Sequence, residues 1–141
     1  MPLGMILGPL FAHVLLVFLL LFLMGLRRGG DIVSKRTKPD EIALREPNWS
    51  LKTLASAYSF SNQFELPVLF YVLTILAIVT RHADYLFVAL SWVFVATRYL
   101  QAIEHVTRNN VRWRGAFYVI GALILALAWG VFAFRILLTL P

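Results

Sequence analysis

The sequence between residues 62 and 71 reads NQFELPVLFY and lies within a long apolar run. On a helix, Asn62 and the Glu65 carboxylate three residues later share one face. A carboxylate is costly in hydrocarbon, so Glu65 should face a bundle interior, a partner charge or a polar cavity. Pro67 removes the helical hydrogen bond to the carbonyl of Gln63 and favours a kink. A polar latch between helices is the simplest alternative to a binding role.

The composition around this segment is that of an integral membrane protein. Of the 141 residues 60% are hydrophobic, and the mean hydropathy is +0.79. Because a crossing takes about 20 residues, this length allows four spans. We predict one all-α domain over residues 1–141, a membrane four-helix bundle. Its spans are expected near residues 5–26, 50–80, 85–106 and 115–138.

The first apolar run is read as a span and not as a signal peptide. It lacks a basic start and ends in Arg27-Arg28 rather than in a small-residue cleavage site. Gly29-Gly30 is expected to end this helix. After the polar connection, Asn48 or Ser50 is expected to cap the next helix.

Positive charge is concentrated in two connections. The segments 27–52 and 107–114 carry ten of the thirteen Lys and Arg residues, whereas the connection after the second span carries only Arg81. The positive-inside rule therefore places both basic loops in the cytoplasm. In a membrane protein the net charge of +6 is no sign of nucleic-acid binding, because the positions of the Lys and Arg residues report the orientation of the chain in the membrane. The polar ends of the second and third spans should then meet at similar depth.

The third span ends in a polar stripe. Arg98, Gln101, His105 and Arg112 follow at offsets of three, seven and fourteen residues, which is one helical face if the helix continues past the membrane surface. Arg98 needs an anion, either Glu65 or a bound carboxylate, and a simple Glu65–Arg98 pair remains open.

Several kinds of chemistry are excluded or disfavoured by residue types. There is no cysteine, so any thiol must arrive with a substrate. The three histidines lie in different parts of the chain, so no metal site is expected. Ser61 has no neighbouring His–Asp pattern, which disfavours a serine hydrolase.

Together these residues resemble the MAPEG family, the membrane-associated proteins in eicosanoid and glutathione metabolism, and a bacterial-type member in particular. The resemblance rests on four spans in about 140 residues, the basic loop after the first span, Asn62-x-x-Glu65-x-Pro67, and Arg98 late in the third span. It covers nearly the whole chain.

The resemblance implies a homotrimer that binds glutathione as co-substrate between subunits at the cytoplasmic side of a bacterial inner membrane. Asn62, Glu65 and Arg98 would contact glutathione, with Gln101, Arg27 and Arg28 as further contacts. Arg112, and secondarily His105, would stabilise the thiolate. The chain departs from the transferases at Tyr58, where they carry Arg, and at Gln101 and His105, where they carry Tyr.

Three function classes follow. The first is a membrane-bound, glutathione-dependent transferase or peroxidase for apolar electrophiles or lipid hydroperoxides, with membrane lipids and an apolar small molecule as partners. The second is a non-catalytic protein of the same fold with a structural latch. The third is a small transporter or proton-linked channel that uses Glu65 and Arg98, which the lack of a repeat between halves and the presence of only four spans disfavour.

Overall fold

The computed structural model describes residues 1–42 and 48–138, with the side chains of residues 41 and 42 left aside. Four helical segments of the described chain are long and apolar enough to cross a membrane, and no strand occurs in the described ranges. The predicted all-α membrane bundle is therefore confirmed. The basic connection also includes Arg45, Glu46 and Pro47, which lie outside the described residues.

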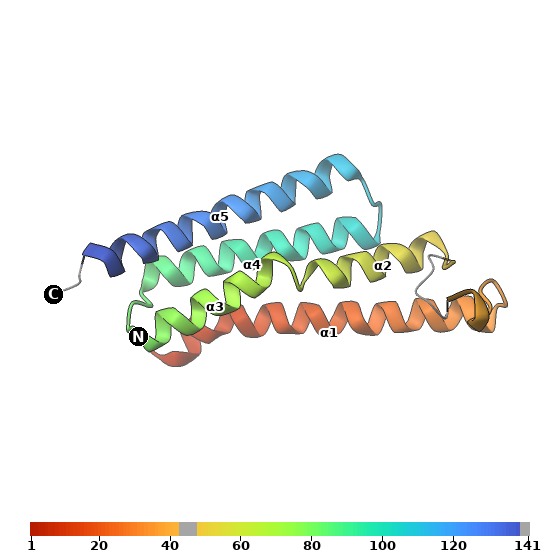
Figure 1. Ribbon diagram of the computed structural model, residues 1–141, viewed down its shortest axis with the longest axis horizontal. Helices are drawn as coiled ribbons and strands as arrows, with labels where there is room; N and C mark the ends of the chain where they lie inside the picture. Colours follow the sequence, from red (N-terminus) through yellow and green to blue (C-terminus); the bar gives the residue numbers. More distant parts are fainter. Residues whose placement is uncertain (43–47, 139–141) are drawn as a thin grey trace.

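The helices run antiparallel along one long axis (Figure 1). The N-terminus, the end of α5 and the α3–α4 turn lie at one end, and the end of α1, the start of α2 and the α4–α5 turn lie at the other. We call the second end the basic end, because the two basic segments of the sequence, 27–52 and 107–114, meet there. The short 3-10 helix η1, Pro39–Ile42, is part of the α1–α2 connection.

The first helix, α1, spans Leu3–Val33 and continues through Gly29-Gly30. The expectation that this pair ends the helix is wrong. Each glycine costs about 1 kcal/mol in a helix, but the last turn is held from outside. Asp31 accepts a hydrogen bond from the Ser50 amide at 2.9 Å, and its own carbonyl accepts from the Thr37 amide at 3.1 Å.

The second span is divided into two helices, α2 at Leu51–Asn62 and α3 at Leu66–Val79. Ser50 caps α2 by accepting a hydrogen bond from the Thr53 amide at 3.3 Å, one of the two caps expected. Pro67 stands at the start of α3, where its missing N–H costs least. The predicted kink is thus a full interruption of the helix, visible in Figure 1 between α2 and α3.

The remaining helices are α4, Tyr85–Val106, and α5, Val111–Leu138. Between them Asn109 has a φ of 52°, a left-handed conformation that ends a helix. Arg112 therefore belongs to the first turn of α5 and not to a continuation of α4. The predicted stripe holds for Arg98, Gln101 and His105, which are all buried on α4, and is wrong for Arg112.

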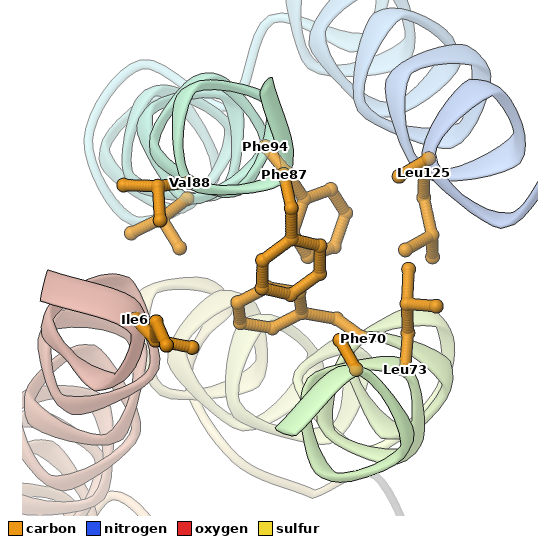
Figure 2. Close-up of a cluster of buried hydrophobic side chains, with 10 residues drawn as sticks. Ile6, Phe70, Leu73, Phe87, Val88, Phe94 and Leu125 are labelled. Carbon is orange, nitrogen blue, oxygen red and sulfur yellow. The ribbon is translucent and has the colours of Figure 1, made fainter. Parts of the chain in front are cut away.

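The apolar core fills the half of the bundle nearer the termini. Figure 2 shows side chains from α1, α3, α4 and α5 converging there, with Phe70 and Phe94 in contact at 5.2 Å between ring centroids. Because lipid is as apolar as this core, the contacts hold the helices together through close van der Waals packing and not through removal from water. The polar side chains described below lie beyond this core, toward the basic end.

At the end of the bundle opposite the basic end, an ion pair joins the start of α4 to the end of α5. Asp84 caps α4 by accepting from the Phe87 amide at 2.9 Å, and it pairs with Arg135 near the end of α5. Burial raises the pKa of the Asp84 carboxyl, but the hydrogen bond from Phe87 and the Arg135 guanidinium outweigh that effect. The pKa therefore lies below its usual value, and the pair persists in mildly acidic conditions.

A close approach of α4 and α5 at Gly121 gives a first stability prediction. A Cβ atom on Gly121 would lie 2.6 Å from the Thr97 hydroxyl, which itself donates to the Phe94 carbonyl at 2.6 Å. Gly121→Ala should therefore lower the free energy of unfolding by about 1–3 kcal/mol. Denaturant titration in detergent micelles measures this change.

Two further variants make the Gly121 test specific. Thr97→Ala in the Gly121→Ala background should recover most of the loss, because it removes the clashing oxygen. Gly130→Ala on the same helix should be tolerated, since a Cβ atom there meets nothing within 4 Å. Equal destabilisation by both alanine substitutions would show that helix propensity, and not the contact with Thr97, governs this position.

Candidate functional site

Arg98 projects from α4 against the interruption between α2 and α3 and is only 1% exposed. Its Nε donates to the Gln63 side-chain oxygen at 3.4 Å, and its Nη2 donates to the backbone carbonyl of Asn62 at 3.2 Å. Because α2 stops at Asn62, its last carbonyls need donors, and a cation suits the negative end of the helix dipole. The interruption at Pro67 thus supplies acceptors for a buried guanidinium.

Gln63 is the centre of a polar network that joins three parts of the chain. Its amide nitrogen donates to the Ser59 carbonyl at 3.0 Å, and its oxygen contacts His13 Nε2 on α1 at 2.8 Å. His13 Nδ1 is hydrogen-bonded to the Tyr71 hydroxyl on α3. Both His13 and Gln63 are almost fully buried, so every one of these polar groups relies on protein partners.

Not every buried polar atom near Arg98 has a partner. In the described part of the chain, six of the seven buried side-chain atoms without one lie in the half of the bundle nearer the basic end, the exception being Trp129 Nε1. Native interiors rarely leave such groups unpaired, so a concentration of them indicates a place for a ligand or water. The six atoms are Arg98 Nη1, Gln101 Oε1, Glu104 Oε1, His105 Nδ1, Ser59 Oγ and Arg28 Nε.

Asn62 and Glu65 were expected to meet Arg98. The structure brings the Asn62 backbone carbonyl, and not its side chain, into contact with Arg98. Glu65 attracts Arg98 electrostatically, yet its carboxylate is exposed and forms no ion pair or hydrogen bond with any described residue. The simple Glu65–Arg98 latch is therefore not formed in the isolated chain, and the Glu65 carboxylate is available to a partner.

Arg27 and Arg28, at the end of the apolar part of α1, differ in what they contact. The Arg27 guanidinium donates to the carbonyls of Lys52 and Val106 and to the Ser56 hydroxyl, at 2.9, 3.1 and 2.7 Å. Arg28 lies over the Trp49 ring at 5.2 Å, and its Nε has no partner within the described residues. Of the two, Arg28 keeps more of its donors available.

The two candidates for thiolate stabilisation also differ in their surroundings. His105 is buried on α4 with Nδ1 unpaired, within electrostatic range of Arg114. Arg112 is exposed on the first turn of α5, where its amide donates to the Asn110 side chain at 3.0 Å. The structure thus gathers Arg98, Gln101 and His105 on one helix and leaves Arg112 on its neighbour.

A groove of about 260 Å³ lies between α4 and α5 near the basic end. Apolar side chains line most of it, and the Glu104–Arg108 ion pair of 2.8 Å forms a polar edge. An apolar molecule with a polar head would match this lining. The apolar lining residues are Leu100, Ile103, Trp113 and Phe117.

His13, Gln63 and Tyr71 belong to the site, although the sequence interpretation gave them no role. A histidine in the middle of an apolar span was the available signal, because an ionisable group inside a membrane indicates function by default. Gln63 was visible within the segment at residues 62–71 as a second amide. The sequence did not predict how α1 is oriented about its own axis, and it is this orientation that directs His13 toward Gln63, fifty residues away.

Comparison with known proteins agrees with this architecture. The sequence profile of the MAPEG family matches residues 6–134, which is nearly the whole chain. No curated protein and no solved structure matched the chain. With four membrane-crossing helical segments and a family match from the first helix to the last, the chain is a multi-pass integral membrane protein and belongs to the MAPEG family.

Proposed function

We propose that the protein is a membrane-bound, glutathione-dependent transferase or peroxidase. The observation that carries the proposal is the buried Arg98 guanidinium, whose Nη1 has no partner in the described residues while Nε and Nη2 are bonded. A buried cation with one free edge matches a carboxylate, and glutathione has two. Membership in a family of glutathione metabolism supports this choice of ligand.

The other unpaired groups match the rest of the tripeptide. The exposed Glu65 carboxylate would accept from the glutathione amine, and Gln101 Oε1 would accept from a peptide N–H. Arg28 would pair with the second carboxylate, because its Nε is unpaired within the described residues, whereas both Nη atoms of Arg27 already bond to the protein. Asn62 would contribute its half-buried amide.

Catalysis requires the glutathione thiolate. An ordinary thiol titrates near about 8.5, so most of it is protonated at neutral pH. A nearby guanidinium favours the charged form and lowers the thiol pKa. Arg112 is the proposed source of this stabilisation, since it is exposed and forms no side-chain bond within the described chain, with His105 as the secondary candidate.

The thiolate would then react with an apolar partner. Attack on an electrophilic carbon forms a thioether and expels the leaving group. Attack on a hydroperoxide forms a sulfenic acid and an alcohol, and a second glutathione thiol then gives water and the disulfide. The groove between α4 and α5 has the apolar lining that a substrate entering from the lipid would need.

Assembly and orientation complete the proposal. The exposed Glu65 would be covered by a neighbouring subunit in a homotrimer, as the family resemblance implies. The basic end would face the cytoplasm, because it carries most of the arginines. Glutathione would then enter from the side on which it is made.

The role of Arg112 gives a direct kinetic prediction. Arg112→Ala should reduce the conjugation rate of an activated aryl chloride about tenfold near pH 6.5, the factor expected for loss of one unit of thiol acidification. Glutathione affinity should stay within about twofold, because Arg112 acts on the thiol and not on the carboxylates. At higher pH the difference in rate between the wild type and Arg112→Ala should become smaller, since the thiol then ionises without a stabilising guanidinium.

Arg81→Ala is the control for Arg112, because Arg81 is an exposed arginine in the α3–α4 turn, at the end of the bundle opposite the proposed site. It should retain the wild-type pH profile. A pH-independent loss in Arg112→Ala would remove this residue from thiolate stabilisation.

A non-catalytic role stays as the second candidate, and one observation favours it. Arg98 already has two hydrogen-bonding partners on the α2–α3 interruption, which is what a structural latch would look like. Calorimetry of the purified protein with glutathione separates the two, since a latch alone binds none.

A further inference from the structure

The network around Gln63 has a fixed direction from one residue to the next. The Ser59 carbonyl can only accept, so the Gln63 group that contacts it at 3.0 Å must be the amide NH₂. The Gln63 oxygen then faces Arg98 Nε and His13 Nε2, at 3.4 and 2.8 Å. The orientation of this amide is therefore set by hydrogen-bond chemistry.

The same reasoning fixes the His13 ring. Its Nε2 faces an acceptor, the Gln63 oxygen, and must carry the proton in the neutral imidazole. Its Nδ1 is then an acceptor, and the Tyr71 hydroxyl donates to it. Tyr71, His13 and Gln63 thus form a chain of donors and acceptors that ends on Arg98.

The consequence for Arg98 is geometric. A guanidinium is a planar fork, so fixing Nε on Gln63 and Nη2 on the Asn62 carbonyl fixes where Nη1 lies. Tyr118, whose ring is 5.8 Å from the guanidinium carbon, adds a further contact. Nη1 is the nitrogen left without a partner among the described residues.

We propose that Gln63, oriented by His13 and Tyr71, is the positioning residue that holds Arg98 with Nη1 free for the anionic ligand. The identity of that ligand as glutathione rests on the function proposed above, whereas the positioning itself does not. Preorganisation of this kind increases affinity because the side chain loses no further freedom on binding. Gln63 contacts no ligand in this account and acts only through Arg98.

The first test uses Gln63→Met, which preserves length and removes both hydrogen-bonding groups. Glutathione affinity, measured by calorimetry on the intact protein, should fall about tenfold. The same substitution in an Arg98→Lys background should cause little further loss, because its effect passes through the Arg98 fork. Thr74→Val is the matched control, since Thr74 is equally buried but bonds only to the Phe70 carbonyl of its own helix at 2.9 Å.

The second test does not depend on glutathione. With ¹⁵N-labelled arginine, the Arg98 Nε–H signal, assigned by its loss in Arg98→Lys, should exchange slowly with solvent in the wild type and in Thr74→Val. It should exchange faster in Gln63→Met. Tyr71→Phe leaves Gln63 in place and should show a smaller increase in the exchange rate of the Arg98 Nε–H. It is the substitute test if Gln63→Met does not fold.

The outcomes separate the two proposals. Wild-type protein that binds no glutathione but shows the protected Nε–H signal and its loss in Gln63→Met would overturn the proposed function and support the positioning role. An unchanged Nε–H signal in Gln63→Met, or affinity losses that simply add in the double variant, would overturn the positioning role.

Discussion

Arg98→Met is expected to weaken glutathione binding by about 30- to 5000-fold, the range for loss of a buried charged partner. The expectation follows from the burial of Arg98, which is 1% exposed and lies beside acceptors on the α2–α3 interruption. A carboxylate that pairs with Nη1 would have no substitute donor in the variant. Calorimetry in micelles, with glutathione as titrant, measures the change.

Arg98→Lys makes the interpretation of this result specific. Lysine keeps the positive charge but lacks the planar fork, so it should recover only part of the affinity. Arg81→Gln, which removes an exposed arginine at the opposite end of the bundle, is the control and should bind like the wild type. Full affinity in Arg98→Met would move the ligand away from the α2–α3 interruption.

The stability of Arg98→Met needs its own measurement. Removal of the guanidinium leaves the Asn62 carbonyl without a charged donor, whereas the Gln63 oxygen keeps His13. The Asn62 carbonyl keeps the Glu65 amide as a donor at 3.4 Å, but the loss of hydrogen bonds from a charged donor costs about 1.5–3 kcal/mol, so some loss of stability is expected alongside the loss of binding. Because methionine preserves the side-chain volume, the helices should still assemble, and far-ultraviolet circular dichroism checks this.

The sequence predicted those parts of the site that follow from the chemistry of single residues. Pro67 cannot donate to the helix before it, so a kink in the second span was predicted, and the structure has a full interruption there. The buried charge of Arg98 predicted an anionic partner, and the described residues supply neutral acceptors instead. The sequence did not predict which groups bond to Arg98, because a backbone carbonyl has no sequence signature. The amide of Gln63 and the carbonyl of Asn62 took the place expected for Glu65.

Two other errors in the sequence interpretation concern helix ends. Helix α1 passes Gly29-Gly30 because Asp31 binds the start of α2, a tertiary contact that outweighs two weak helix formers. Arg112 leaves the stripe because Asn109 adopts a left-handed conformation after α4. In the first case a contact with a distant segment outweighs the local signal, and in the second a single residue between two helices ends the helical face.

Arg27 and Arg28 are adjacent in sequence, yet the structure gives them different tasks. Arg27 joins three helices, since it donates to α2 through Lys52 and Ser56 and to the carbonyl of Val106, the last residue of α4. A cation at that carbonyl also complements the helix dipole. Arg28 has a contact with Trp49 and a buried Nε without a partner in the described chain.

Arg27→Ala should therefore lower the free energy of unfolding by about 3 kcal/mol, because the hydrogen bonds that it removes have a charged donor. Arg28→Ala should cost no more than about 1 kcal/mol, the value of an exposed cation–π contact. Glutathione binding should show the reverse order, since both Nη atoms of Arg27 already bond to the protein, whereas Arg28 forms no hydrogen bond within the described residues. Denaturant titration and calorimetry on the same two variants measure both quantities.

Arg27→Lys adds the control for charge at the basic end. It preserves the positive charge but cannot reach three acceptors with a planar fork, so its stability should lie between those of the wild type and Arg27→Ala. If Arg27→Ala instead lost glutathione affinity with its stability intact, Arg27 would be a ligand contact and the ties to α2 and α4 would be incidental. If Arg27→Ala loses more stability and Arg28→Ala loses more glutathione affinity, then Arg27 holds the helices together and Arg28 binds the anionic ligand.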